Sequence, residues 1–454
     1  MASTARALVA FSAVVLSLAA PTAHASDSLP PTLIRDVRIF DGLNDELSPP
    51  SQLLVEDGKI SRISESALEA PPGARVIDGG GRVLTPGFVD THVHLMLALP
   101  LERIQNATAW YRGAAAADNM RSMLMRGFTT VRDAAGADGS IARAVDDGLI
   151  EGPRVFPSGP AITQTGGHGD FRPPATPHPA LEGAHFFRNF RGVGVIADGR
   201  AEVLRAAREN LKNGATQIKI MGGGGVTSEY DPLHVVQYTP EEVRAAVQVA
   251  ENQGTYVVAH AYHDRSIRML VDNGVRQIVH GHLLSEKTIR YAAKKGVKIQ
   301  SELVWSQLND EFGRRLGLGE DRLSKNRQVL DRSAEFFRLL AKHDMAPAFG
   351  TDIVGPHQQF QNREFTLRGE IFPPAEVLRQ ATSQAFELID MSGPLNRYGR
   401  FGVIEEGALA DLLIVDGNPL EDVSILERPE EVLVLIMKDG RIHKQTIASP
   451  PAGS

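Results

Sequence analysis

The sequence predicts an α/β protein, a (β/α)8 barrel with a small β-sandwich built from both ends of the chain. Apolar strand-like runs alternate with amphipathic helical patterns between about residues 87 and 400. Short β-type runs recur at both ends of the chain, and polar side chains of chemically active types follow several strands of the middle. Strands that alternate with helices pair in parallel, which is the architecture of a barrel of this kind.

The first 25 residues have the pattern of a cleavable secretory signal. A lone Arg6 precedes an apolar run from Ala7 to Ala20, and Ala23-His24-Ala25 stands before Ser26. The apolar run is shorter than a membrane-spanning helix needs. We therefore expect cleavage after Ala25, export to the periplasm or the medium, and no stable membrane insertion.

Composition and charge exclude several classes of protein. The chain has 454 residues, a formal net charge of -7 and no cysteine. The acidic balance and the lack of a basic run argue against nucleic acid as a partner. Without cysteine there are neither disulfides nor thiolate ligands, so a metal ion would bind to His, Asp, Glu or a modified Lys.

Two β-rich segments, 26–86 and 401–454, flank the middle of the chain. The first contains LIRDVRIFDG and SQLLVEDGKISRI, and the second contains GALADLLIVDGNP and EVLVLIMKDGRIHK. D-G pairs between such runs are typical of hairpins, and two of them are Asp416-Gly417 and Asp439-Gly440. The shared pattern predicts one β-sandwich assembled from both segments, with the middle inserted between them.

The middle, residues 87–400, repeats strand and helix. Its strand-like runs include FTTVRDA, QIKIM, TYVVAHA, RQIVHGH, VKIQSEL and APAFGTD, and its helical patterns include RAEVLRAARENLKNG, TPEEVRAAVQVAENQG and DRSIRMLVDNG. The three helical patterns end in N-G or Q-G, which is a frequent helix stop. The length fits a (β/α)8 barrel. A doubly wound open sheet is the alternative, but no glycine fingerprint follows the first strand.

The stretch TPGFVDTHVHLML, residues 85–97, ends an apolar run with His92 and His94. Side chains two residues apart on a strand project to the same face, roughly 7 Å apart. The pair thus offers two nitrogen ligands to one point. An isolated H-x-H pair is more often one core histidine beside one surface histidine, so the interpretation depends on the other ligands that the chain supplies.

Further polar residues stand where later strands end, which is where barrel enzymes keep their chemistry. Counted in units of one strand and one helix, the histidine pair and four of these residues fall on strands one, four, five, six and eight. The residues are Asp133, His168, Lys219, His260, His280, Glu302 and Asp352.

Lys219 would be out of place among histidines as an ammonium group, because a cation repels a metal ion. It stands between Ile218 and Ile220, where burial would lower its pKa and favour reaction of the neutral amine with carbon dioxide. The carbamate product is an anionic ligand that can bridge two metal ions. The alternative is a lysine paired with an acid beside a mononuclear site.

The combination of PGFVDTHVHL, a strand lysine, two later single histidines and GTD resembles the amidohydrolase superfamily. Within it, the chain resembles the branch of imidazolonepropionases, Xaa-Pro dipeptidase-like enzymes and bacterial ochratoxin-hydrolysing amidohydrolases. The similarity extends over essentially the whole chain after the signal. TGGHGD, residues 165–170, and GGVTSEYDPLHVVQYT, residues 224–239, are more specific to the dipeptidase-like branch.

The resemblance implies a binuclear centre of divalent metal ions, with zinc as the expected metal. Asp352, Lys219 and His280 are assigned to catalysis, and Asp352 would pass a proton to the departing nitrogen. The expected ligands are His92, His94 and Asp352 for the first ion, His260 and His280 for the second, and N6-carboxylated Lys219 bridging both together with a hydroxide.

The choice of His260 and His280 over their near neighbours His263 and His282 rests on position. Each chosen histidine directly ends its apolar run and matches the family motif.

Three residues are expected to contact substrate: His168, Tyr230 and His357. His168 lies in a glycine-rich loop, where it could reach a substrate carbonyl. By resemblance to the dipeptidase-like members, Tyr230 could hydrogen-bond a substrate carboxylate. His357 and its neighbour Gln358 follow Asp352. A turn histidine and a surface tyrosine are the alternatives. The run from Gly222 to Gly225 is not a phosphate loop, since the Lys-Ser/Thr ending is missing.

The resemblance implies a metal-dependent hydrolase of the amide bond in N-acyl amino acids or dipeptides, of the carboxypeptidase or Xaa-Pro dipeptidase kind. Conversion of ochratoxin A to phenylalanine and ochratoxin alpha is one such reaction. The alternative is a lactam or lactone hydrolase of imidazolonepropionase type. A non-catalytic scaffold is disfavoured because all six ligand positions are filled. By family analogy we expect a small-molecule amide or peptide as the partner and a homo-oligomer, such as an octamer.

Overall fold

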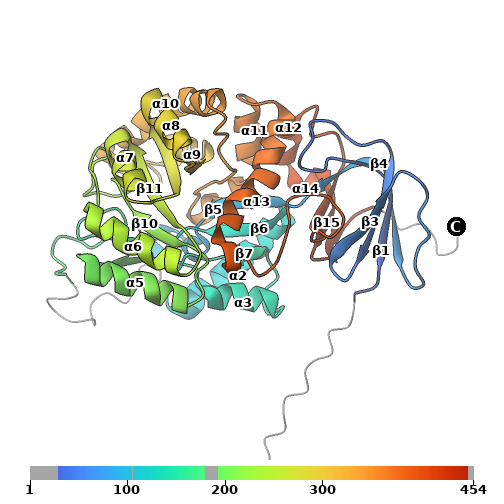
Figure 1. The fold of residues 1–454 in the computed structure, drawn as a ribbon, viewed down its shortest axis with the longest axis horizontal. Helices are drawn as coiled ribbons and strands as arrows, with labels where there is room; N and C mark the ends of the chain where they lie inside the picture. The colour runs from blue at the N-terminus through green and yellow to red at the C-terminus, as the bar shows by residue number, and fades with distance from the viewer. Residues whose placement is uncertain (1–28, 105, 179–192, 448–454) are drawn as a thin grey trace, which may run out of the picture.

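The computed structural model describes residues 29–104, 106–178 and 193–447. The expected secretory signal, residues 1–25, lies outside the described residues. The described strands form three sheets. Two of these are parallel, and the third, which is mixed, lies at one end of the molecule (Figure 1).

A six-stranded parallel sheet holds most of the strands predicted in the middle of the chain. Its order is β13-β12-β11-β10-β8-β9. All its described pairs are parallel, as the alternation of strands and helices predicts. The strands are β8 (Ala161–Thr163), β9 (Gly194–Ile196), β10 (Ile218–Met221), β11 (Val257–His263), β12 (Gln277–Leu283) and β13 (Lys298–Gln300).

The second parallel sheet has the order β5-β6-β7. The stretch PSGP, residues 157–160, separates β7 from β8, because proline has no N–H to give to a ladder. The strands are β5 (Phe88–Val93), β6 (Phe128–Asp133) and β7 (Arg154–Phe156).

Residues 348–352 lie between the two parallel sheets. Ala348 forms a parallel bridge with Gln300. On the other side, the N–H of Thr91 donates to the carbonyl of Phe349 at 2.9 Å, and the N–H of Asp352 donates to the carbonyl of His92 at 2.8 Å. The α/β architecture with parallel sheets is thus confirmed, while closure into an eight-stranded barrel stays a prediction.

Both β-rich segments of the chain contribute to one seven-stranded sheet with the order β16-β15-β14-β4-β1-β2-β3. The pair β1 and β4 is parallel and the other pairs are antiparallel. A second layer that would make a sandwich, and the domain boundaries, stay predictions. The strands are β1 (Thr32–Ile39), β2 (Ser51–Glu56), β3 (Lys59–Ser64), β4 (Arg75–Pro86), β14 (Leu412–Val415), β15 (Leu433–Lys438) and β16 (Arg441–Gln445).

D-G pairs close two hairpins of this sheet. Asp57-Gly58 joins β2 to β3 and Asp439-Gly440 joins β15 to β16, with all four residues at positive φ, which a two-residue hairpin turn favours. Asp416-Gly417 differs from the expectation. It opens a longer connection that contains η4 (Val423–Glu427) and α14 (Pro429–Val432).

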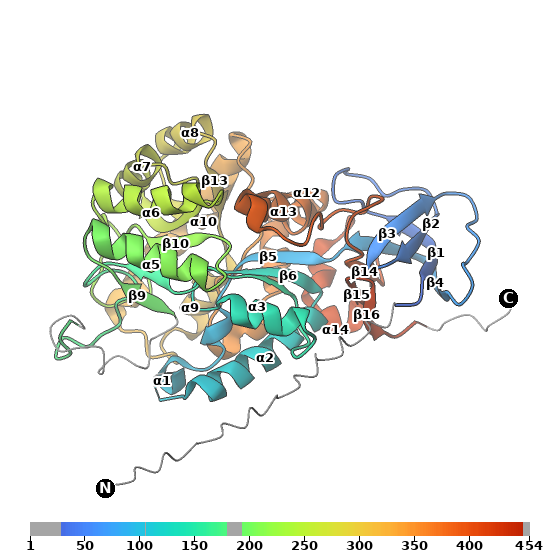
Figure 2. The same ribbon diagram turned by 60° about the horizontal axis from the view of Figure 1, so that its bottom comes forward.

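Helices surround the parallel strands, and α5 to α8 lie along their outer side (Figures 1 and 2). As predicted, α5, α6 and α7 stop just before Gly214, Gly254 and Gly274, each at positive φ. In the described part of the chain, no helix combines the length and hydrophobicity needed to cross a membrane. Besides α14, the described residues form the α-helices α1 (Leu101–Ile104), α2 (Ala109–Met125), α3 (Gly139–Asp146), α5 (Arg200–Lys212), α6 (Pro240–Asn252), α7 (Asp264–Asp272), α8 (Glu286–Lys294), α9 (Val304–Phe312), α10 (Glu320–Lys342), α11 (Arg363–Gly369), α12 (Pro374–Gln380) and α13 (Ser383–Ile389). The remaining 3-10 helices are η1 (Leu95–Leu97), η2 (Gly355–Phe360) and η3 (Asp390–Leu395).

Four buried aromatic rings pack where β5 meets residues 348–352. The rings of Phe88, Phe128, Phe349 and Phe365 have centroid distances between 4.6 and 6.3 Å. Aromatic pairs at such distances stabilise a core beyond the area they bury. This packing fixes the two segments that carry His92 and Asp352.

Candidate metal centre

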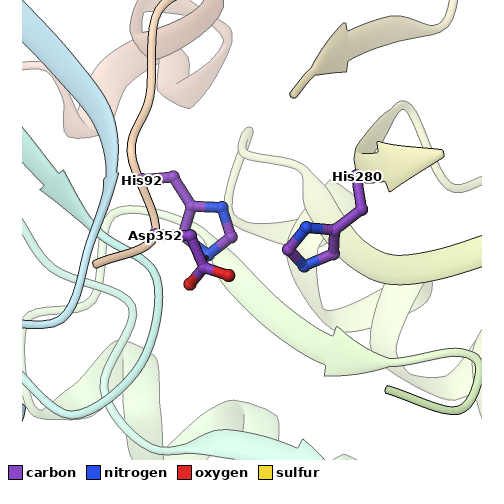
Figure 3. A group of neighbouring side chains, drawn as sticks. All are labelled: His92, His280 and Asp352. Carbon is purple, nitrogen blue, oxygen red and sulfur yellow. Dashed lines mark ion pairs between the residues drawn. The ribbon is translucent and has the colours of Figure 1, made fainter. Parts of the chain in front are cut away.

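Two strands and the segment 348–352 bring His92, His280 and Asp352 together. His92 lies near the end of β5, His280 lies in β12, and Asp352 follows the bridge at Ala348. His280 and Asp352 have positive φ, at 73° and 54°. Such conformations are costly for residues other than glycine and cluster at functional sites. Here they turn both side chains toward His92 (Figure 3).

One carboxylate oxygen is the meeting point of two imidazoles. Oδ1 of Asp352 lies 2.9 Å from Nε2 of His94 and 3.3 Å from Nε2 of His92. A ligand atom of His280 completes a group whose members lie within 4.8 Å of one another together with His92 and Asp352. Imidazole nitrogens around a carboxylate are a donor set that fits a divalent metal ion.

His260 and Lys219 lie on the neighbouring strands. The ring of His260 is 4.5 Å from that of His280, and its Nε2 is 3.1 Å from the carbonyl of Gly224, which leaves Nδ1 clear of that bond. Lys219 is 1% exposed. The negative charge of Asp352 raises the pKa of Lys219, in opposition to burial.

Burial controls the charge of the histidines. It lowers the pKa of His92 and His260 well below their ordinary range and that of His280 to about 3. For His94, burial opposes the charged form, but the hydrogen bond with Asp352 and the negative charges of Asp352 and Asp133 together outweigh it, and the pKa rises. Neutral imidazole is the form that binds metal ions, so His92, His260 and His280 have the protonation state of ligands.

Burial and charge pairing compete in setting the pKa of Asp352 and that of Lys219, and pairing prevails for Asp352 while burial prevails for Lys219. Burial would raise the pKa of Asp352, but its interactions with His92 and His94 hold the pKa below its ordinary value. Burial lowers the pKa of Lys219 to about 7 against the attraction of Asp352. A neutral amine is therefore available at neutral pH, as carbamate formation requires.

The remote nitrogens of two site histidines are held by residues at the end of β13. Nδ1 of His92 lies 2.7 Å from Oε1 of Gln300, and Nδ1 of His280 lies 2.6 Å from Oε1 of Glu302. Burial raises the pKa of Glu302 to about 8. A proton therefore stays on the Glu302 and His280 pair while no cation is near, and a bound cation favours the carboxylate.

His168 lies against the centre rather than in an open turn. Its ring stacks on that of His260, with centroids 4.1 Å apart and planes 13° apart. Nδ1 of His168 is 2.7 Å from Oγ of Ser228 and 3.1 Å from Oδ2 of Asp231. These contacts leave Nε2 of His168 as the nitrogen available to a ligand.

The other residues expected to contact substrate are more dispersed. Tyr230 is 43% exposed, in the same loop as Asp231. His357 stacks on Phe312, with centroids 5.1 Å apart. Gln358 is buried and donates through Nε2 to the carbonyl of His94 at 3.2 Å, so it supports the His94 backbone.

The structure separates the chosen histidines from their neighbours. His282 is buried, with Nε2 2.8 Å from the carbonyl of Glu302 and its ring 5.5 Å from Phe336. His263 is the residue before α7. Asp133 accepts hydrogen bonds from the backbone N–H groups of the loops that follow β5 and β6.

The glycine run of residues 222–225 has a packing explanation. A Cβ at Gly225 would overlap the ring of His168, and one at Gly224 would overlap the backbone of Pro232. The run lets the chain pass close beneath His168.

Sequence reasoning missed Gln300, Ser228 and Asp231. Gln300 ends β13 and Glu302 follows two residues later, and because side chains two residues apart in extended chain point the same way, that spacing is a signal that could have linked them. Asp231 and Ser228 reach His168 across about 60 residues, and no local pattern marks such a contact.

Comparisons with known proteins identify the family. The profile of the Amidohydrolase family matches residues 83–442. Ochratoxinase from Aspergillus niger is 31% identical over 382 residues, which cover 80% of this chain and 76% of that protein. Its crystal structure superposes with a TM-score of 0.81 at 27% identity, covering 92% of this chain and 96% of that chain.

Two other solved structures are similar over their whole length. The crystal structure of an amidohydrolase has a TM-score of 0.87 and 38% identity, covering 92% of this chain. That of a prolidase complexed with N-methylphosphonate-L-proline has a TM-score of 0.86 and 35% identity, covering 91% of this chain. The chain belongs to the amidohydrolase family. It is a hydrolase that acts on amide bonds.

Proposed function

We propose that this protein is a metal-dependent hydrolase of the amide bond between an acyl group and an amino acid, acting on dipeptides, N-acyl amino acids and ochratoxin A. The convergence of His92, His280 and Asp352, together with the burial of Lys219, carries this proposal. The likeness to an ochratoxinase and a prolidase supports an amide whose nitrogen belongs to an amino acid.

The proposed centre holds two divalent ions, with zinc as the expected metal. His92, His94 and Asp352 would bind one ion, His260 and His280 the other, and a carboxylated Lys219 both. Two ions held this way acidify a water molecule and polarise the substrate carbonyl. Burial of Lys219 supports the modification, because an unpaired ammonium at that position would be expensive.

Side chains of the protein transfer the proton and bind the substrate. Asp352 accepts a proton from the attacking water and delivers it to the amide nitrogen, which leaves as a neutral amine. His168 contacts the substrate with the Nε2 edge of its ring, beside the acyl oxygen. Tyr230 hydrogen-bonds the carboxylate of the amino-acid part from its exposed loop.

The proposal also includes a closed barrel, a β-sandwich, export and assembly. The two parallel sheets and residues 348–352 would close into a (β/α)8 barrel, with the mixed sheet as part of a β-sandwich. The protein would be exported through its N-terminal signal and would assemble into a homo-oligomer.

Product release from a substrate panel tests the proposal. Zinc-loaded protein would be incubated with Xaa-Pro dipeptides, N-acyl amino acids and ochratoxin A, and the products identified by mass spectrometry. We expect cleavage that disappears after chelation and in Lys219→Ala. Metal-replete protein that leaves the whole panel intact would refute this function and favour the lactam and lactone alternative.

A further inference from the structure

We propose that Gln300 and Glu302 form a positioning relay that couples His92 and His280, so that the two proposed metal positions fill together. This inference rests on the metal centre of the proposed function. β13 supplies none of the six proposed ligands, yet the side chains at its end hold one ligand of each position.

The relay is a continuous chain of three hydrogen bonds. Nδ1 of His92 bonds to Oε1 of Gln300 at 2.7 Å, Nε2 of Gln300 donates to Oε2 of Glu302 at 3.1 Å, and Oε1 of Glu302 bonds to Nδ1 of His280 at 2.6 Å. Gln300 is fully buried and Glu302 is 3% exposed. In such an environment an unmade hydrogen bond is costly, so every donor in the chain must face an acceptor.

The donor and acceptor sequence fixes both histidine tautomers. A carboxylate at Glu302 only accepts, so the amide of Gln300 must turn its Nε2 toward Glu302 and its Oε1 toward His92. Nδ1 then carries the proton in both His92 and His280. Each imidazole is left with a free Nε2 lone pair, which faces Asp352 in His92.

The backbone around Glu302 is clamped from both sides. Glu364 accepts hydrogen bonds from the N–H groups of Leu303 at 2.9 Å and Val304 at 2.8 Å, and Arg368 donates to the carbonyl of Ser301. Glu364 and Arg368 are themselves fully buried and paired. The relay therefore starts from a rigid strand end.

Glu302→Gln, a change beside His280, also disturbs His92 at the other end of the relay. Its new amide can still accept from His280 through oxygen, but its NH₂ then meets the NH₂ of Gln300. Gln300 relieves this clash by turning over, which presents a donor to Nδ1 of His92 and puts the imidazole proton on Nε2. One substitution beside His280 thus blocks His92, a ligand of the other proposed metal position.

Exchanging the two side chains restores the pattern. In the double variant Gln300→Glu/Glu302→Gln, the carboxylate at position 300 accepts from His92 and from the amide at position 302, and that amide's oxygen accepts from His280. Every donor again meets an acceptor. A role in packing alone would not be rescued by this exchange.

Zinc content after equilibrium dialysis against graded chelator tests the relay. We expect wild-type protein to retain about two zinc ions per chain, and Glu302→Gln to lose both together at a free zinc concentration about 10- to 100-fold higher. The double variant should regain wild-type retention. Lys298→Gln, an exposed change at the other end of β13, is the matched control.

Several results would overturn the relay. Glu302→Gln that loses one ion alone, or an exchanged variant that retains no more zinc than Glu302→Gln, would show that the positions are independent. Wild-type protein that binds no zinc would instead refute the proposed metal centre itself. Thermal unfolding of the metal-free proteins checks the fold. If Glu302→Gln does not fold, Gln300→Met, which removes both of that residue's hydrogen bonds at similar length, should lose both ions.

Discussion

Oδ1 of Asp352 accepts a hydrogen bond from Nε2 of His94 at 2.9 Å, although 258 residues separate the two in sequence. The N–H of Asp352 also donates to the carbonyl of His92. Side chain and backbone of one aspartate are thus tied to His94, just after β5, and to His92 within β5. The carboxylate is held in its ionised form, with a pKa below its ordinary value, which is the state that a proton acceptor needs.

Asp352→Asn should slow hydrolysis. The amide cannot take up a proton from water, so kcat for dipeptide hydrolysis should fall by at least about 100-fold. Steady-state kinetics with zinc-loaded protein measure this, together with circular dichroism to show that the fold persists. A fall of less than tenfold would remove Asp352 from the proton-transfer role.

Lys219→Met should stabilise the metal-free protein at low pH. The pKa of Lys219 is about 7 in the folded protein and about 10.4 in an unfolded chain. Below pH 7 the amine is charged in both states, so the whole cost of burying it opposes folding. Between about pH 7 and 10 the unfolded chain binds more protons, so wild-type stability rises with pH and the advantage of the variant shrinks.

Differential scanning calorimetry with chelator present at pH 6 and pH 9 checks this prediction. We expect Tm of Lys219→Met to exceed that of wild type by several degrees at pH 6 and by less at pH 9. Lys298→Met, which removes an exposed lysine, should change Tm little at either pH. Equal gains at both pH values would contradict a buried ammonium as the cause.

Arg154→Met should destabilise the whole molecule. Arg154 on β7 is paired with Asp411, which stands just before β14, at 2.7 Å, and both side chains are 1% exposed. Removing one partner leaves a buried, uncompensated charge, which costs about 3–5 kcal/mol. Urea unfolding measures the loss. Arg82→Met, which removes an exposed ion pair with Asp416, should cost about 1 kcal/mol or less, and a similar cost for both variants would refute the argument.

The strand ends of the barrel-like middle could be predicted from the sequence because they obey local rules. The strands Val257–His263 and Gln277–Leu283 contain the apolar runs that precede His260 and His280, and Gly254 and Gly274 mark the ends of the preceding helices. Family membership followed from the same motifs and is confirmed.

The hydrogen-bond partners of the site could not be predicted in the same way. The bond from His92 to Gln300 spans 208 residues and depends on how residues 348–352 seat between β13 and β5. The contact of His168 with Asp231 depends on a loop whose course is set by Lys325, which donates to three of its carbonyls. Periodicity and spacing carry no information on such contacts.

Asp231→Asn should impair His168 without removing it. Oδ2 of Asp231 lies 3.1 Å from Nδ1 of His168 and accepts from the N–H of Gly225 at 2.7 Å. The amide competes poorly for both donors, so the imidazole loses its orientation, and kcat/KM should fall by about 10- to 100-fold. Asp147→Asn is the control, because Asp147 pairs with Arg143 at 3.3 Å on the exposed surface. An unchanged kcat/KM for Asp231→Asn would separate Asp231 from the reaction.

Tyr230→Phe should weaken binding of the substrate's carboxylate group. The hydroxyl of Tyr230, on a side chain that is 43% exposed, is proposed to donate to the carboxylate of the amino-acid part. A hydrogen bond to a charged group contributes about 1.5–3 kcal/mol, so KM for a dipeptide should rise roughly 10- to 100-fold while kcat changes little. The matched dipeptide amide lacks the carboxylate, so its KM should be the same for wild type and variant. If KM rose equally for both substrates, Tyr230 would act on the shape of the loop and not on the carboxylate.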